Sequence, residues 1–432
     1  MIAEFTIENF FSIRTAQTFS FEATTDKLMS DEYSYEVKKG VRLLKIGIIY
    51  GANASGKTNI LNAIEFFKIL VLNIPKDRMA STDVVPFMLN DTSRKEKSKL
   101  SMTFYIDSDK YILSFELDKQ RIYSELLLVY ESSRPAILYK REYNEETDSS
   151  EITFGTNLKM SKQNQATIAG NTINNCSVMA AFGKSNVEKS RLNDVYDYFA
   201  KQVKDVLSPE MMSSSYIKRH LENDESGELK TFVLKLLKAS DFNIQDLSLH
   251  DEEELITPEL ERVINNLPMS SGTKEEMLKK GKITKTEILF THKAGEGLYE
   301  LPENYESSGT IRFLGMAVML NSLLNECHFI PIDEVETSIH YELLSYFIKV
   351  FLANSNKTSQ LLLTTHDTNL LNEDYIRRDT IWFTDKDEKG ETKIVRLSSL
   401  GLHKNLSPYN AYKQGKLVKL PFLGSQYIDL ND

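Results

Sequence analysis

Residues 51–58 have the sequence Gly-Ala-Asn-Ala-Ser-Gly-Lys-Thr, which satisfies the pattern G-x-x-x-x-G-K-[ST]. The apolar run at 41–50 predicts a buried strand before this segment, and apolar residues at helical spacing over 60–71 predict a helix after it. A strand, a glycine-rich turn and a helix in this order form the context in which the pattern indicates a phosphate-binding loop. Average residue frequencies give about 0.01 chance matches in a chain of this length, so the segment predicts a P-loop fold of the α/β class.

The residue types in this loop suit a phosphate group. Glycines at 51 and 56 let the backbone bend so that consecutive N–H groups point at a phosphate, and the following helix adds the partial positive charge of its N-terminus. Lys57 would reach the β- and γ-phosphates, and the Thr58 hydroxyl would hold Mg²⁺. The predicted nucleotide contacts come from Asn53, Ala54, Ser55, Gly56, Lys57, Thr58 and Asn59.

A second segment supplies carboxylates. Residues 329–334, Phe-Ile-Pro-Ile-Asp-Glu, form an apolar strand pattern that ends in two acids. Beside a P-loop, Asp333 would join the Mg²⁺ shell, and Glu334 would polarise the attacking water as the general base. Taken alone, the same pattern also fits a strand that ends in a solvated turn.

Two further segments carry groups that can bind anions. Glu306–Thr310, Glu-Ser-Ser-Gly-Thr, precedes a helix predicted from about residue 311, and such a turn is either an anion-binding nest or a simple helix cap. His366 follows an apolar strand pattern and would either hydrogen-bond a γ-phosphate or lie on the surface.

The remaining patterns predict an α/β domain split by an insertion. Alternating runs over 100–130 predict an antiparallel meander, the polar stretch 142–175 predicts a loop or crossover, and 186–280 has helical patterns. From about residue 284 strand and helix patterns alternate again. The predicted domains are an N-terminal ATPase lobe at 1–175, a helical insertion at 176–290 and a C-terminal lobe at 291–432.

The order of these motifs resembles the ABC-type ATPase head of the SMC, RecF and OLD families. The resemblance implies a P-loop NTPase head, with a mixed central sheet, an antiparallel N-terminal sheet and an inserted helical subdomain. It implies ATP and Mg²⁺ as cofactors. It also implies that Glu334, Lys57 and His366 are catalytic and that Thr58 and Asp333 hold the metal.

The resemblance assigns two more parts of the site. Ser307, Ser308 and Gly309 would form the signature loop, in which Ser308 replaces the first glycine of the family's pattern. The opening strand would bring Arg14 near the nucleotide. The usual glutamine of the family is missing between Asn59 and Lys119.

A subgroup matches more closely. Its patterns ESxGT, IDExExSxH and TTHDTxLL occur here at 306–310, 332–340 and 364–371. Its C-terminal pattern is met by Asp379, Trp382, Lys386, Asp387, Tyr412, Gly415 and Pro421. These features resemble the AbiL/RloA/AriA-type ATPases of prokaryotic phage-defence operons.

The resemblance also implies which partners the chain binds. Heads of this type imply a head-to-tail homodimer with two ATP molecules sandwiched between Lys57 of one chain and Ser307 of the other, and a higher oligomer is left open. A separately encoded effector, a nuclease or toxin, would carry the toxic activity. No nuclease activity of its own is expected, because clustered acids after apolar strands are not found beyond His366.

Two alternatives remain. One is a DNA-repair ATPase of the RecF or SMC kind that binds DNA directly. For that alternative, the lysines of residues 274–285 would touch DNA, although a solvated charged face explains them as well. The other is the ATPase subunit of a membrane transporter, which the altered signature and the missing glutamine disfavour.

The composition of the chain excludes several classes of protein. Acidic residues outnumber basic ones, 62 to 52, which argues against a highly basic nucleic-acid coat. Two cysteines exclude a disulfide scaffold and suit a reducing compartment. A signal peptide pattern and an 18-residue apolar stretch are both missing. We therefore expect a cytoplasmic protein without a membrane partner.

Overall fold

The computed structural model describes residues 1–267, 269–355, 358–401 and 406–418. The described residues divide into two compact units. The first unit contains Met1–Ser208, Leu323–Thr337 and the described residues from Ile348 onward. The second contains Pro209–Ser322 and Ser338–Phe347. Helices α10 (Ser308–Asn325) and α11 (Tyr341–Asn354) begin in the second unit and end in the first.

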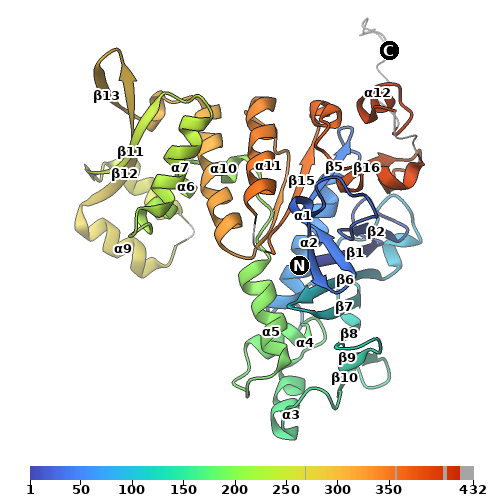
Figure 1. Ribbon diagram of the computed structural model, residues 1–432. Coiled ribbons are helices and arrows are strands. Elements are labelled where there is room, and N and C mark those ends of the chain that lie inside the picture. Colours follow the sequence, from blue (N-terminus) through green and yellow to red (C-terminus); the bar gives the residue numbers. More distant parts are fainter. Residues whose placement is uncertain (268, 356–357, 402–405, 419–432) are drawn as a thin grey trace, which may run out of the picture. The chain divides into compact units, whose positions relative to one another are not determined.

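Among the described residues, the first unit has a central sheet of five strands in the order β14-β15-β5-β16-β17. Its strands are β14 (Phe329–Ile332), β15 (Gln360–Thr365), β5 (Ile46–Gly51), β16 (Ile381–Lys386) and β17 (Thr392–Arg396). All pairs are parallel except β16–β17. Strand β5, from the N-terminal part of the chain, thus lies between β15 and β16 from its C-terminal part (Figure 1). The predicted mixed central sheet is confirmed.

Burial explains why these segments are strands. Every residue of β5, β14 and β15 is buried, as expected for parallel strands covered on both faces. The single strand predicted over 41–50 is wrong in one respect, because the chain breaks at Lys45. Strand β4 (Val41–Leu44) pairs with β3 (Ser34–Lys38), and only β5 enters the central sheet. The Lys45 amine donates to the Ser355 carbonyl at 2.6 Å, which satisfies a buried charge at the break.

The second sheet of this unit is antiparallel, with seven strands among the described residues in the order β10-β9-β8-β7-β6-β1-β2. Its strands are β1 (Ile2–Glu8), β2 (Gln17–Ser20), β6 (Ser98–Ile106), β7 (Asp109–Leu117), β8 (Ile122–Tyr130), β9 (Ala136–Asn144) and β10 (Ser149–Phe154). Alternate residues of β7 and β8 are buried, so the predicted meander is confirmed.

The loop predicted over 142–175 is wrong. Residues 149–154 form β10, and Lys162–Asn171 form helix α3. Strand β10 lies at the edge of the sheet, and its residues are exposed or half-buried in alternation. A strand in that position needs few apolar residues, so its polarity did not exclude it.

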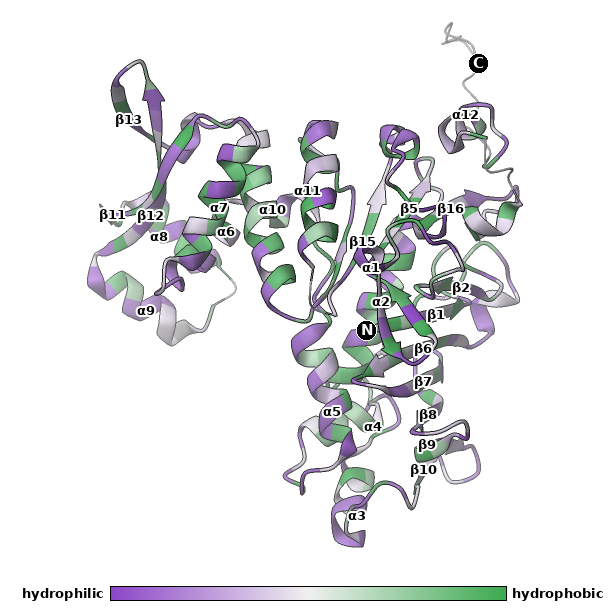
Figure 2. Ribbon diagram, in the orientation of Figure 1, coloured by the Kyte–Doolittle hydropathy of each residue, from purple (hydrophilic) through white to green (hydrophobic). Residues whose placement is uncertain are grey.

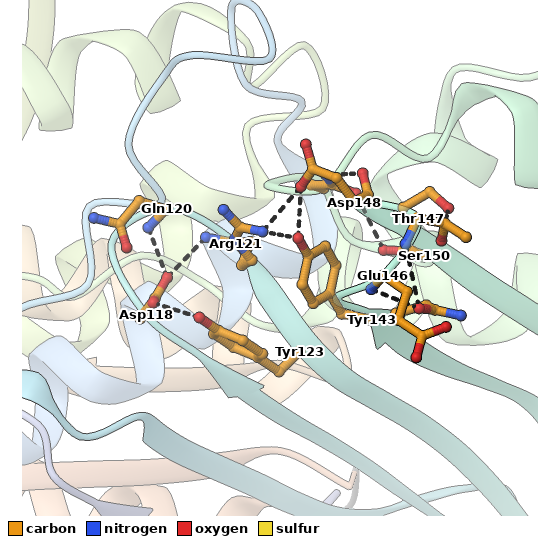
Figure 3. A network of polar contacts seen from close by, with 12 residues as sticks. Asp118, Gln120, Arg121, Tyr123, Tyr143, Glu146, Thr147, Asp148 and Ser150 are labelled. Carbon is orange, nitrogen blue, oxygen red and sulfur yellow. Dashed lines mark hydrogen bonds and ion pairs between the residues drawn. The ribbon is translucent and has the colours of Figure 1, made fainter.

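A polar network joins the two turns at one end of this sheet (Figure 3). Arg121, after β7, forms an ion pair with Asp148 at 3.0 Å and lies over the ring of Tyr143. On the neighbouring strand, Tyr123 donates to Asp118 at 2.9 Å. Asp148 is exposed and the other groups are half-buried, so each contact contributes little alone, but together they link the two turns.

Helix α2 (Lys57–Leu72) is the core element that follows the glycine-rich loop. Its Phe67 ring lies 5.6 Å from Phe5 on β1 and 5.2 Å from Phe115 on β7, so this helix packs on the antiparallel sheet. The Phe67 side chain is fully buried, and burial of one such side chain contributes roughly 1.5–3 kcal/mol. The C-terminal half of α2 is therefore fixed against this sheet by its packing.

A buried ion pair supports the far end of the same helix. Glu125 on β8 and Arg141 on β9 have fully buried side chains, 3.8 Å apart. Arg141 donates to the carbonyls of Cys176 and Asn174. The next residue, Ser177, donates to the Leu70 carbonyl in the last turn of α2. The pair thus holds the segment that caps α2.

The other helices of the first unit are short. They are α1 (Ser30–Tyr33), α4 (Val178–Gly183), α5 (Arg191–Asp197) and α12 (Pro408–Lys413). Within the predicted helical stretch 186–280, α5 gives way after Asp197 to a π-helical turn at Tyr198–Gln202.

The second unit contains strands as well as the predicted helices. Its helices, besides the starts of α10 and α11, are α6 (Ser214–Glu222), α7 (Glu228–Ala239), α8 (Pro258–Asn266) and α9 (Ser271–Lys280). Its strands are β11 (Ile244–Leu255), β12 (Lys282–Ala294) and β13 (Gly297–Pro302).

The prediction that residues 186–280 form helices is therefore wrong for the segment that forms β11. The exposed half of that strand is acidic, and it pairs with β12 instead of packing in a core. Figure 2 shows largely apolar residues along α10 and mostly hydrophilic ones along α9. In the described residues, no helix is long and apolar enough to cross a membrane.

Candidate nucleotide-binding site

The loop between β5 and α2 has the backbone that its glycines permit. Ala54 and Gly56 have positive φ values of 62° and 105°. A Cβ atom on Gly51 would lie 2.2 Å from Thr384 Oγ1, and one on Gly56 would lie 2.2 Å from Thr392 Oγ1. Both glycines are therefore required by close approach, and Gly56 also by its φ angle.

The N-terminus of α2 is open to an anion. Its N-cap residue, Gly56, provides no side-chain cap, and the first turn contains no acidic residue. Asn53, Ala54 and Thr58 are exposed around it. Uncapped N–H groups together with the helix dipole favour a bound phosphate at this position. This geometry fits the predicted phosphate-binding role of the loop.

Lys57 is only 5% exposed and lies beneath the loop. Its Nζ donates to the carbonyls of Gly51 at 3.0 Å and Ala52 at 3.3 Å, and lies 2.9 Å from His366 Nε2. An ammonium can only donate, so the imidazole accepts in this pair. Burial lowers the pKa of Lys57, and the nearby carboxylates of Asp333, Glu336 and Glu334 oppose that shift.

Asp333 lies at the end of β14, where it meets the start of α2. Thr58 Oγ1 donates to Asp333 Oδ2 at 2.8 Å, and Thr364 on β15 donates to the other carboxylate oxygen. A hydroxyl and a carboxylate side by side are the oxygen donors that Mg²⁺ takes. The residues present therefore fit the predicted metal. Thr364 was not predicted, since a hydroxyl inside an apolar strand pattern has no distinctive spacing.

Glu334 follows in a strained conformation, with a φ of 45°. Its N–H donates to Thr364 Oγ1 at 2.9 Å, and its Oε1 lies 3.9 Å from His366 Nε2. The carboxylate is half exposed. A non-glycine residue in this region costs roughly 1–3 kcal/mol and occurs often at functional sites. The chain directs this acid away from the core.

Glu336 is a further acid, which belongs to the subgroup pattern at 332–340 but was not predicted as a catalytic or metal-binding residue. One of its carboxylate oxygens accepts the N–H of His366, and the other is buried without a hydrogen-bond partner in the described part of the chain. This contact fixes the turn that carries the imidazole. The five side chains of Lys57, Thr58, Asp333, Glu334 and His366 are thus brought together within the first unit.

Ser307, Ser308 and Gly309 lie in the second unit, at the start of α10. Ser307 Oγ accepts the Thr310 N–H at 3.0 Å, which is the helix-cap arrangement. A Cβ atom on Gly309 would lie 3.0 Å from the Ser338 carbonyl, so a larger residue would not fit easily. A nucleotide contact by these three residues stays a prediction.

Arg14 lines a cavity of about 550 Å³ together with Phe87 and residues 387–390. Its nucleotide contact also stays a prediction. Ser12, two residues earlier, accepts a hydrogen bond from Asn59 Nδ2 at 2.6 Å, which links the opening segment to the start of α2.

Among the C-terminal residues of the subgroup pattern, Asp379 and Tyr412 make contacts inside the first unit. Pro421 lies outside the described residues. Asp379 is buried against Arg377 at 2.6 Å. Tyr412 stacks on Phe383 at 5.8 Å. Both contacts hold the chain around β16.

The lysines at the end of the insertion are mostly paired. Lys282 contacts Glu253 and Lys285 contacts Glu287, each at 2.6 Å, and Lys274 donates to a backbone carbonyl. This pattern favours the solvated-face interpretation of the cluster.

Residues 47–372 match the family model described as "AAA domain, putative AbiEii toxin, Type IV TA system". The chain belongs to this family. The predicted ABC-type ATPase head of the SMC and RecF group is thereby confirmed. In this AAA-family chain, Lys57, Thr58, Asp333, Glu334 and His366 lie in the first unit and Ser307–Gly309 in the second. A comparison with curated proteins gives no match.

Solved structures of SMC heads are similar to this AAA-family chain. The "SMC head domain from Thermotoga maritima" is 14% identical, with 91% of this chain and 98% of that chain covered and a TM-score of 0.43. An SMC head bound to the C-winged helix domain of ScpA is also 14% identical, with 92% and 99% covered and a TM-score of 0.43. Similarity this low identifies no substrate or partner.

Proposed function

We propose that this chain binds ATP with Mg²⁺ and hydrolyses it to ADP and phosphate. The supporting observation is that Lys57, Thr58, Asp333 and His366 converge in one unit from segments far apart in the sequence. A lysine at a helix N-terminus, a hydroxyl beside a carboxylate and an adjacent acid are the parts that phosphoryl transfer requires. Membership of an AAA family supports the same activity.

Each side chain has a task in this proposal. Lys57, which now contacts loop carbonyls, would turn to the β- and γ-phosphate oxygens. Thr58 and Asp333 would hold Mg²⁺, which neutralises charge on the phosphates when it is bound. Glu334 would orient and deprotonate the attacking water, because its carboxylate is exposed beside the site. His366 would hydrogen-bond the γ-phosphate.

The second part of the proposal is a dimer. Two chains would close head to tail around two ATP molecules, with Ser307 of one chain meeting the nucleotide held by Lys57 of the other. The N-terminus of α10, where Ser307 lies, favours an anion and supports this arrangement. ATP would stabilise the closed dimer because that state binds it more tightly, and hydrolysis would release the two chains.

Glu334→Gln tests both parts. The amide keeps the shape of the side chain but cannot accept the proton of water, so we expect retained ATP, slow phosphate release and a dimer mass by light scattering. Lys57→Ala is the control, which should neither retain ATP nor dimerise. Hydrolysis by Glu334→Gln at the wild-type rate would refute the base assignment. A monomer mass with ATP bound would refute the dimer.

The third part of the proposal concerns the role of the ATPase in the cell. We propose that the ATPase regulates a separate effector, a nuclease or toxin, in defence against phage. The family's description, "putative AbiEii toxin, Type IV TA system", supports a role beside a toxic activity. A pull-down from the native host should recover a neighbouring gene product. Recovery of DNA-repair proteins instead would contradict the defence role.

One observation favours the DNA-binding alternative. Lys279 and Lys280, at the C-terminal end of α9, are exposed. If they bind DNA, the affinity of the purified protein for duplex DNA should fall steeply with salt, and a Lys279→Glu/Lys280→Glu variant should have a shallower dependence. Equal, weak binding by both proteins would leave regulation of an effector as the better proposal.

A further inference from the structure

Three hydroxyl side chains from outside the motif lie directly behind the glycine-rich loop. They are Ser12, which follows β1, Thr384 on β16 and Thr392 on β17. Strands β16 and β17 form an antiparallel pair, and β16 also pairs with β5, the strand that leads into the loop. The sheet order therefore places a C-terminal hairpin against an N-terminal loop.

Thr392 holds the loop at its centre. Its Oγ1 donates to the Ser55 carbonyl at 2.8 Å and lies 2.7 Å from Ser12 Oγ. Ser12 in turn accepts from Asn59 Nδ2 at 2.6 Å, and its carbonyl accepts the Thr392 N–H at 2.7 Å. Thr392 is fully buried, so its bond to the Ser55 carbonyl is shielded from water, whereas Ser12 and Asn59 are half-buried.

Thr384 holds the same loop from the neighbouring strand. Its Oγ1 lies 2.6 Å from Ser55 Oγ and donates to the Tyr50 carbonyl at 3.2 Å. Both hydroxyls of the Thr384–Ser55 pair are buried. Ser55 is thus fixed twice, through its carbonyl by Thr392 and through its side chain by Thr384.

The two threonines also explain why glycine is needed in this loop. Their hydroxyl oxygens lie where Cβ atoms of Gly51 and Gly56 would be, each at 2.2 Å. The loop therefore closes onto the hairpin with one side and leaves its other side open. That side carries the exposed Asn53 and Ala54, where a phosphate would bind.

We propose that Thr384 and Thr392 are positioning residues for the phosphate-binding loop. Their hydroxyls brace Ser55 from behind and hold the loop in the shape that a phosphate needs before any nucleotide arrives. Neither residue would touch the nucleotide. This inference rests on the proposed function, since it assigns the residues that prepare the proposed ATP site.

The test compares isosteric and conservative variants in the full chain. Thr392→Val and Thr384→Val keep the side-chain shape and remove the hydroxyl, whereas the corresponding serine variants keep the hydroxyl. Thr380→Val is the matched control, because Thr380 is equally buried and donates to the Arg377 carbonyl at 2.6 Å, away from the loop. Binding of ATPγS with Mg²⁺ is measured by calorimetry, and folding by the fluorescence of Trp382.

We expect each valine variant to weaken ATPγS binding about tenfold, because the loop loses hydrogen bonds that hold Ser55. The serine variants should bind within about twofold of wild type, and so should Thr380→Val. If a valine variant fails to fold, Ser12→Ala replaces it, since it removes a partner of Thr392 at a half-buried position.

Two results would overturn the inference alone. Either the valine variants bind ATPγS as tightly as the wild type, or Thr380→Val weakens binding as much as they do. Wild-type protein that binds no ATPγS would overturn the proposed function itself, and the inference with it.

Discussion

The Arg141→Met substitution tests how much the buried ion pair between Glu125 and Arg141 stabilises the first unit. Methionine fills a similar length but removes the guanidinium, which donates to the carbonyls of Cys176, Asn174 and Ile173. The carboxylate of Glu125 then remains fully buried without its cation. Its other partners, the Tyr139 hydroxyl at 2.6 Å and the Val178 N–H at 2.9 Å, stay in place.

The expected loss of stability can be worked from these contacts. Removing one partner of a buried ion pair costs about 3–5 kcal/mol, and each buried carbonyl left without a donor adds about 1–3 kcal/mol unless water reaches it. We therefore expect a loss of at least 4 kcal/mol, as an order-of-magnitude value. The double variant Arg141→Met/Glu125→Gln should recover part of it, because no buried charge remains.

The loss should also depend on pH. Burial raises the pKa of Glu125, and Arg141 opposes that shift, so the pKa in Arg141→Met rises further. Between the unfolded and the folded pKa the folded state holds the extra proton. Stability of the variant therefore falls as pH rises through this window, and the deficit against wild type is larger at neutral pH than in mild acid.

Urea unfolding followed by Trp382 fluorescence measures the effect. Trp382 is the one tryptophan of the chain, and it is buried in the same unit as Arg141. A loss below about 1 kcal/mol, the level of an exposed ion pair, would refute the reasoning. No recovery in the double variant would show that the lost carbonyl contacts, not the uncompensated charge, carry the effect.

Three further predictions concern other residues. Glu336→Ala removes the acceptor for the His366 N–H, so phosphate release should slow about tenfold or more with an unchanged KM for ATP; an equal rate would dismiss the anchoring role. Burial raises the pKa of the Cys176 thiol to about 12. At neutral pH Ellman's reagent should therefore react only with Cys327 in the folded chain and with both thiols in urea. Rapid reaction of both thiols without urea would contradict the buried position of Cys176. Gly56→Ala places a Cβ atom 2.2 Å from a threonine hydroxyl at a φ of 105°, so ATP binding should weaken more than about tenfold; wild-type affinity would argue against the loop geometry.

Local patterns predicted the strand, glycine-rich turn and helix at residues 46–72 well. The strand, the glycines and the helix from Lys57 are adjacent in sequence, so their meaning does not depend on the rest of the chain. Asp333 and His366 could also be found, because both follow apolar strands whose carboxyl ends meet at one edge of a parallel sheet. For these residues, the order of the motifs along the chain was enough to predict that they lie close together.

Other residues of the site depend on sheet order. Thr384 and Thr392 reach the loop only because β16 pairs with β5, and nothing in their own sequence indicates that pairing. Edge strands were missed for a related reason. β10 and the acidic half of β11 bury few side chains, so their stability comes from pairing with a neighbouring strand and their composition resembles that of a loop or surface helix.

Phosphate release from Mg·ATP by the purified chain tests the central claim most directly. The wild-type protein and Asp333→Asn are compared at equal concentration, with folding checked by Trp382 fluorescence. The asparagine keeps an acceptor for the Thr58 hydroxyl but loses the charge that would hold the metal. We predict steady turnover by wild type and at least a hundredfold less by the variant, about 2.7 kcal/mol of lost transition-state stabilisation. Equal release by both proteins would contradict the claim that these residues form an ATPase site.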